Sequence, residues 1–206
     1  MTHSPTRTAR TALALLTGAL GCAAPKEAWH PPPPEVLVEV MPQRAVVTVD
    51  GVEVPAGHPV AVPDPAHAYA FQAVLAGYLP LESKATGQAL AGTRLGLVLR
   101  PEGFGQARKL DLDEGQGLSA AAALLERRGA HADAMEYAER AAEVAPELPL
   151  ARRVLGDAAY ALGRGRRAVA EYSAYLSLAP DAPDRRSIEA RVERLRGDLT
   201  IPGVDR

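Results

Sequence analysis

Residues 129–146, GAHADAMEYAERAAEVAP, are followed thirty-four places later by residues 163–180, GRGRRAVAEYSAYLSLAP. Both copies begin with a glycine, carry an alanine five places on and end in Ala-Pro. A repeat of this period, with helical spacing of apolar residues inside each copy, indicates stacked helical hairpins. The prolines end helices because a proline nitrogen cannot donate to the helical hydrogen-bond ladder. This repeat decides the fold of the C-terminal half of the chain.

The second copy is preceded by Leu155-Gly156 and carries Tyr172 in its second helix, whereas the first copy has Ala121-Ala122 in place of Leu-Gly. These positions resemble the pattern of the tetratricopeptide (TPR) family, whose repeats are 34 residues long. The resemblance covers residues 115–182 and implies two TPR repeats forming a helical hairpin array. The four helices are expected at residues 118–128, 132–144, 150–162 and 166–178.

A further helix is predicted at residues 183–197. Ile188, Val192 and Leu195 recur there at spacings of four and three, which is typical of one apolar face. We expect this helix to cap the array, with residues 198–206 as a tail. Since two repeats are fewer than the three usually needed for stability, we also expect the β-rich region or another chain to cover the N-terminal edge.

In TPR arrays the first helix of each pair lines a concave groove. The resemblance therefore implies that a protein or peptide ligand binds along these first helices, unless their side chains are simply exposed. The residues expected to contact the partner are Glu126, Arg153, Asp157 and Tyr160.

Residues 35–101 show the alternating pattern and the β-branched residues that are typical of β-strands. Val36, Val38 and Val40 alternate with other residues, and AVVTV at 45–49 is separated from VEV at 52–54 by Asp-Gly, which predicts a hairpin. Short strands are also predicted at residues 59–62, 68–75 and 93–99.

The landmarks of this region are Pro42-Gln43-Arg44-Ala45, Asp50-Gly51, Gly57-His58-Pro59 and Gly77-Tyr78. Their order resembles the PEGA domain, a small β-sandwich-like module whose naming motif is Pro-Glu-Gly-Ala; here the two middle positions differ. The resemblance implies surface attachment or interaction rather than catalysis. We thus expect an α+β multidomain chain, with the β module joined to the helices by a linker at residues 102–114.

The N-terminus is typical of an export signal. Arg7 and Arg10 precede an apolar stretch that is too short to cross a bilayer, and Cys22 follows it directly. This layout resembles a bacterial lipobox. It implies cleavage of a signal peptide at residues 1–21, a covalent lipid on Cys22, and an outer-membrane lipoprotein facing the periplasm. The alternative is ordinary cleavage after Ala24.

Residues 22–34 contain four consecutive prolines, which favour an extended polyproline II tether that spaces the folded part from the membrane. A ligand for a polyproline-binding partner is the alternative.

Composition excludes several classes of function. The net charge of −2 argues against a nucleic-acid partner, and a single cysteine excludes an intrachain disulfide and a cysteine-based metal centre. His58 and His67, with Asp64 between them, could be metal ligands, but solvated loop histidines are the simpler interpretation. No nucleophile, base and orienting group recur in a catalytic pattern, so we expect neither an enzyme nor a cofactor beyond the lipid.

The sequence therefore predicts a membrane-anchored envelope lipoprotein that acts as a protein–protein interaction scaffold, with an envelope component at the β module. Two alternatives remain open. The chain could be an assembly or regulatory subunit of a secretion, motility or pilus machine, or a peptidoglycan- or carbohydrate-binding protein.

Overall fold

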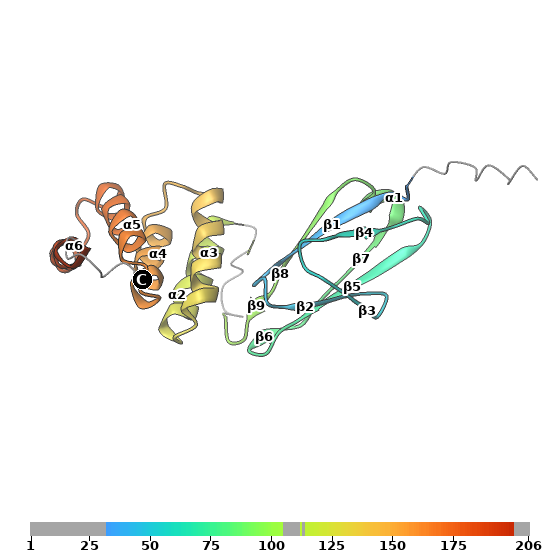
Figure 1. Cartoon of the computed structure of the whole chain (residues 1–206), viewed down its shortest axis with the longest axis horizontal. Coiled ribbons are helices and arrows are strands. Elements are labelled where there is room, and N and C mark those ends of the chain that lie inside the picture. The colour runs from blue at the N-terminus through green and yellow to red at the C-terminus, as the bar shows by residue number, and fades with distance from the viewer. Residues whose placement is uncertain (1–31, 105–111, 113, 200–206) are drawn as a thin grey trace, which may run out of the picture. The chain divides into compact units, whose positions relative to one another are not determined.

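The computed structural model describes residues 32–104, 112 and 114–199. The predictions for the signal peptide, Cys22 and most of the tether fall outside these residues. So does the predicted tail from residue 200, whereas residues 198 and 199, also assigned to the tail, belong to a helix. The described chain is β-rich up to residue 101 and helical from residue 115 (Figure 1), which confirms the α+β class.

The β-rich region contains nine strands and one short helix among the described residues. They form a sheet of order β4-β1-β8, a sheet of order β3-β2-β5-β7, and a ribbon of β6 and β9. β1 and β8 are parallel, and every other pair is antiparallel. The elements are β1 (Glu35–Met41), β2 (Val46–Val49), β3 (Val52–Val54), β4 (Pro59–Ala61), β5 (Ala68–Val74), β6 (Tyr78–Leu79), β7 (Leu81–Thr86), α1 (Gly87–Leu90), β8 (Arg94–Val98) and β9 (Arg100–Pro101).

Alternation along the strands builds the core of this region. Val36, Val38 and Val40 of β1 are buried, as are Val47 and Phe71 of the second sheet. Side chains of opposite parity along β1 stay partly or fully exposed. Such alternation is expected where one face of a sheet packs on a core.

The predicted hairpin of β2 and β3 is confirmed. Asp50 and Gly51 both have positive φ, of 49° and 80°, as a two-residue hairpin turn with the twist of the flanking strands requires. The Asp50 carboxylate also accepts the backbone N–H of Ala70 at 2.8 Å, which ties the turn to β5.

Strand β7 was not predicted, because its sequence LESKAT lacks the β-branched apolar residues that mark strands. It pairs with β5 over six residues at the end of the four-stranded sheet. Charged residues such as Glu82 and Lys84 suit an edge strand, because they discourage pairing with another chain.

From residue 114 to 199 the structure describes five helices, and the first four begin and end within three residues of the predicted bounds. Consecutive helices pack on each other, and α2 also packs on α4. Gly129 and Gly163 have φ of 76° and 71°, which lets the chain turn between the helices of each pair. The helices are α2 (Gly115–Arg127), α3 (His131–Val144), α4 (Pro149–Ala161), α5 (Gly165–Leu178) and α6 (Arg185–Leu199).

Small residues allow these helices to approach closely. A Cβ on Gly156 of α4 would lie 2.5 Å from ring atoms of Tyr172 on α5, so the tyrosine ring occupies the space that the glycine leaves. At the equivalent positions of the first repeat the residues are Ala122 and Ala138, which are both fully buried. The two repeats thus fill the same positions with different pairs of residues.

Helix α6 lies two residues later than predicted, at Arg185–Leu199 instead of 183–197. Its buried residues are Ile188, Val192 and Leu195, as the spacing predicts, and it packs on α5. The predicted linker 102–114 is not a fully exposed connection, since the side chains of Phe104 and Leu112 within it are buried.

Candidate functional site

A groove of about 650 Å³ crosses the helical region, and we call it the α2–α4 groove. Helix α4 contributes more lining residues than any other element, because Pro149 starts the helix and the residues that follow at helical spacing share one face. The lining residues are Ala123, Glu126, Arg127, Pro149, Leu150, Arg153, Val154, Asp157, Tyr175, Ala179, Ala182, Pro183 and Asp184.

Three of the four residues predicted to contact a partner line this groove: Glu126, Arg153 and Asp157. Tyr160 does not line it. Its ring lies beside α6 instead, where the Arg191 guanidinium carbon is 5.3 Å from the ring centroid. The repeat pattern placed Tyr160 on the same face of α4, but the cation–π contact with α6 holds the ring beside that helix.

The charged residues of the groove neutralise one another. Arg153 donates to Asp157 one helical turn away and to Asp184 at 2.9 Å. Asp157 also accepts the Tyr172 hydroxyl at 2.8 Å and Arg191 at 2.9 Å. A site balanced in this way carries little net charge, so electrostatic attraction alone would not select its ligand.

The pKa values of Arg153, Tyr175 and Asp184 keep these three groups in their ordinary charge states near neutral pH. The Tyr175 hydroxyl and then Arg153 lower the pKa of Asp184. Burial, followed by the hydrogen bond to Asp184, raises the pKa of Tyr175 to about 12. Burial alone would lower the pKa of Arg153, but its bonds to Asp157 and Asp184 raise it overall. The network therefore offers fixed hydrogen-bonding geometry rather than a group poised to exchange protons.

The rest of the lining is largely apolar. Leu150 is 45% exposed at the start of α4. Val154 lies one helical turn further on, and Pro149, Ala179 and Pro183 also border the groove. Leu150 and Pro183 are exposed and Val154 is buried, so the apolar part of the groove can bury a partner's side chain beside a fixed Arg–Asp network that orients its backbone.

Sequence reasoning missed Tyr175, Asp184 and Arg191, because it considered only the first helix of each pair. Tyr175 had a detectable signal. The equivalent residue of the first repeat is the small Ala141, so a large tyrosine at this position of the second repeat is a departure that can be seen in the sequence.

A second cluster joins the β-rich region to α3. Asp133 is 2% exposed and accepts both ends of the Arg44 guanidinium and, at 2.6 Å, the Tyr78 hydroxyl. Tyr137, which is fully buried, donates its hydroxyl to the carbonyl of Leu99. Burial and then Asp133 raise the pKa of Tyr78, so this hydroxyl stays protonated and keeps donating.

These contacts show what covers the N-terminal hairpin of the helices. The described residues from Pro33 onward belong to one compact unit, and side chains of the β-rich region fasten directly onto α3. The β-rich region therefore covers the open edge that two repeats leave, which was one of the two alternatives raised by the sequence.

The histidines singled out by the sequence do not converge on a metal site. His67 contacts the Asp50 carboxylate at 2.9 Å, while the Asp64 side chain accepts backbone N–H groups of Ala66 and His67 and shapes its own loop. His58 contacts the carbonyl of Ala56. Among the described residues no three His, Cys, Asp or Glu side chains are grouped closely enough to hold a metal ion.

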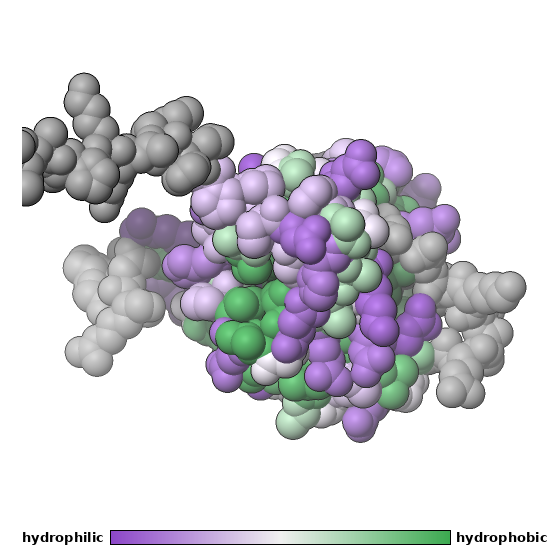
Figure 2. All heavy atoms as spheres, turned by 90° about the vertical axis from the view of Figure 1, so that its right-hand side faces the viewer, coloured by the Kyte–Doolittle hydropathy of each residue, from purple (hydrophilic) through white to green (hydrophobic). Residues whose placement is uncertain are grey.

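Two further observations bear on surfaces. Val46 and Val74 pair across β2 and β5 and remain 42% and 39% exposed. Hydrophobic side chains also gather into a patch among hydrophilic ones on the face of the molecule drawn in Figure 2.

Within the part of the chain that the structure describes, no helix has the length and apolar character needed to cross a membrane.

No protein-family model matches the chain, and no curated protein matches it either. The functional argument therefore rests on the residues and the geometry.

Proposed function

We propose that this chain is a lipid-anchored envelope protein that holds an extended segment of a partner protein in the α2–α4 groove. In this proposal the helices are two TPR repeats with a C-terminal cap. The β-rich region is a PEGA-like, sandwich-type module that covers their open edge and contacts the envelope. The lipid on Cys22 and the proline-rich tether keep the molecule at the membrane.

The observation that carries the proposal is the lining of the groove. The C-terminal end of α2 and the N-terminal part of α4, the first helices of the two repeats, border one groove. Among its apolar residues Leu150 and Pro183 remain exposed although the charges of Arg153, Asp157 and Asp184 are paired. Exposed apolar side chains grouped in a groove favour a binding surface over ordinary solvated surface.

Site-specific photocrosslinking in intact envelopes tests this proposal. A photoreactive amino acid at Leu150 should crosslink a partner protein, because this side chain is exposed inside the groove. Leu162 provides the matched control, since it is a leucine of similar exposure (39%, against 45% for Leu150) just after α4 and outside the groove.

Crosslinks from position 150 that are absent from position 162 would support a protein partner in the groove. The same adducts from both positions, or none from position 150, would contradict it.

A further inference from the structure

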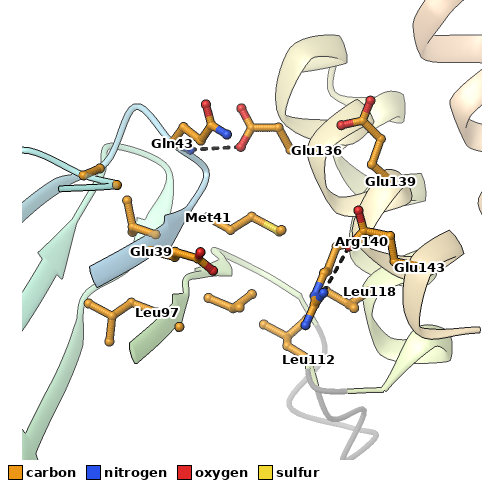
Figure 3. Close-up of a pocket in the computed structure, with 15 residues that line it drawn as sticks. Glu39, Met41, Gln43, Leu97, Leu112, Leu118, Glu136, Glu139, Arg140 and Glu143 are labelled. Carbon is orange, nitrogen blue, oxygen red and sulfur yellow. Dashed lines mark hydrogen bonds and ion pairs between the residues drawn. The ribbon is translucent and has the colours of Figure 1, made fainter. Parts of the chain in front are cut away.

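A second groove, of about 700 Å³, lies between the β-rich region and α3, and we call it the junction groove. It is separate from the α2–α4 groove, and no residue lines both. Figure 3 shows Glu39, Met41 and Leu97 on the strands, and across the space from them the side chains of α3. The lining residues are Glu39, Val40, Met41, Gln43, Ala56, Gly57, Gly96, Leu97, Val98, Leu112, Leu118, Glu136, Glu139, Arg140 and Glu143.

Two parallel strands supply one wall of the groove. Residues 39–41 of β1 and 96–98 of β8 all line it. Neighbouring residues of a strand point to opposite faces, so three consecutive lining residues mean that backbone as well as side chains borders the groove. β1 and β8 pair with each other over these residues, and β8 is the end strand of its sheet. An end strand favours a ligand that is itself extended, because such a chain can pair with the backbone groups on the strand's outer edge.

Gly96 lies in the middle of this wall. It pairs with Glu39, it is exposed, and a Cβ placed on it would meet no atom within 4 Å. Neither packing nor a positive φ requires glycine here, and glycine weakens a strand. A glycine in such a place is typical of a site where another backbone approaches closely.

The opposite wall is acidic. Glu136, Glu139 and Glu143 come from α3, and Glu39 faces them from β1. Most of these carboxylates have partners: Glu39 pairs with Arg94, Glu139 with Arg167 and Glu143 with Arg140.

Glu136 differs from the other three. Among the described residues it has no ion-pair partner, and its hydrogen bond comes from the backbone N–H of Gln43 at 2.9 Å. Burial, together with the nearby carboxylates of Asp133 and Glu139, raises its pKa. Arg44 acts in the opposite direction but does not outweigh them, and it forms its ion pair with Asp133. A partly buried carboxylate without an ion pair of its own gains from a positively charged ligand that replaces its lost hydration.

The lining of the groove favours a cationic peptide over a metal ion. The lining contains four carboxylates and one guanidinium, and since arginines pair with three of the carboxylates, Glu136 is the one open to a positive charge on a ligand. The carboxylates are too dispersed for a metal site, since no group of described side chains meets that requirement. The apolar floor of Met41, Leu97 and Val98 suits aliphatic side chains between the charges.

We propose that the junction groove binds an extended cationic segment of a partner protein, in which Lys or Arg alternates with aliphatic residues. The segment runs along the ends of β1 and β8 and past Gly96. It directs one cation to Glu136 and its aliphatic side chains to the apolar floor. The groove forms only when the β-rich region is fastened to α3, so the ligand binds a surface that neither region has alone.

The test uses the purified full-length chain and a fluorescent hexapeptide in which Lys and Val alternate, capped at both ends. Binding is measured by anisotropy, with a Glu/Val peptide of the same length as the charge control. We expect the Lys/Val peptide to bind in the micromolar range and to bind more weakly as salt rises, because salt screens the ion pairs. The Glu/Val peptide should not bind.

Two variants locate the site. Gly96→Val projects a side chain into the groove from a position where a Cβ meets no atom within 4 Å, and should weaken binding at least tenfold at unchanged thermal stability. Glu136→Gln removes the unpaired charge and should weaken binding about tenfold, as expected for a charge-assisted hydrogen bond. Glu193→Gln is the matched control, because it removes the same charge from the exposed face of α6.

Several outcomes would overturn the proposal. These are no binding of the Lys/Val peptide at millimolar concentration, equal binding of both peptides, or equal loss of affinity in Glu136→Gln and Glu193→Gln. Loss of binding on replacing Leu150 by Asn, with Gly96→Val unaffected, would overturn it too, since it would place the peptide in the α2–α4 groove. The proposed function would survive each of these outcomes, because it concerns the α2–α4 groove and its own crosslinking test does not depend on the peptide.

Discussion

Arg44 of the β-rich region and Asp133 of α3 form a bidentate ion pair, with Nε 2.9 Å from Oδ1 and Nη2 2.6 Å from Oδ2. The two partners differ in their access to water. The Asp133 side chain is 3% exposed, whereas that of Arg44 is 59% exposed. The carboxylate therefore depends on its protein donors, Arg44 and Tyr78, in place of solvent.

This asymmetry predicts which partner is more costly to remove. Arg44→Met leaves a buried carboxylate with the Tyr78 hydroxyl as its remaining side-chain donor, and should lower the free energy of unfolding by about 3 kcal/mol. Asp133→Asn leaves a mostly solvated guanidinium and should cost about 1–2 kcal/mol. Urea unfolding followed by circular dichroism measures both. A smaller loss for Arg44→Met than for Asp133→Asn would contradict the assigned dependence of Asp133 on Arg44.

The helices and the β2–β3 hairpin could be predicted from the sequence, whereas the contact between Arg44 and Asp133 could not. The period of 34 residues predicted four helices, because glycines at the turns and prolines at the ends punctuate it directly. The Asp-Gly turn likewise predicted the β2–β3 hairpin. Both are local signals, and each is contained in a few neighbouring residues.

The junction depends on residues far apart in the chain, and no local signal encodes such pairing. Its residues nevertheless depart from the two patterns. Gln43 and Arg44 are the positions where the Pro-Glu-Gly-Ala motif differs, and both contact α3. Asp133 and Tyr137 stand where the second repeat has the very different Arg167 and Glu171. Asp133 and Tyr137, at which the first repeat differs from the second, thus lie on the face of α3 that packs against the β-rich region.

The close contact between Gly156 and Tyr172 gives a second prediction. Gly156→Ala places a methyl group 2.5 Å from atoms of a fully buried ring, and should lower the free energy of unfolding by about 1–3 kcal/mol despite the better helix propensity of alanine. Gly197→Ala in α6 is the control, because its added Cβ meets no atom within 4 Å. That variant should be stabilised by up to about 1 kcal/mol. Thermal unfolding compares the two, and a stabilised Gly156→Ala would refute the tight packing.

The network around Asp184 predicts a specific pH dependence. Its pKa is lowered first by Tyr175 and then by Arg153, so the folded chain favours the carboxylate. The resulting stability is complete above the ordinary aspartate pKa of about 4 and is lost as the pH falls through the lowered folded value. The free-energy difference between the native chain and Asp184→Asn should therefore be largest near neutral pH and shrink below about pH 4.

Urea unfolding at a series of pH values measures this difference. Asp181→Asn is the control, since Asp181 is exposed in the same loop and has no ion pair among the described residues. Its difference from the native chain should stay small at every pH. A difference for Asp184→Asn that is constant between neutral and acidic pH would rule out the proposed contribution of this carboxylate.

The proposed lipid anchor predicts where the protein is found in fractionated cells. A single acyl chain gives only marginal membrane binding, whereas several chains give stable anchoring, so modification of Cys22 should hold the protein in the membrane fraction. Cys22 lies outside the described residues, and the prediction follows from its place after the apolar stretch. Cys22→Ser should remove the lipid and the membrane association together, while Ala24→Ser should preserve both. Intact mass separates the alternatives, because ordinary cleavage after Ala24 would give an unmodified chain beginning at Pro25, with a fractionation that Cys22→Ser leaves unchanged.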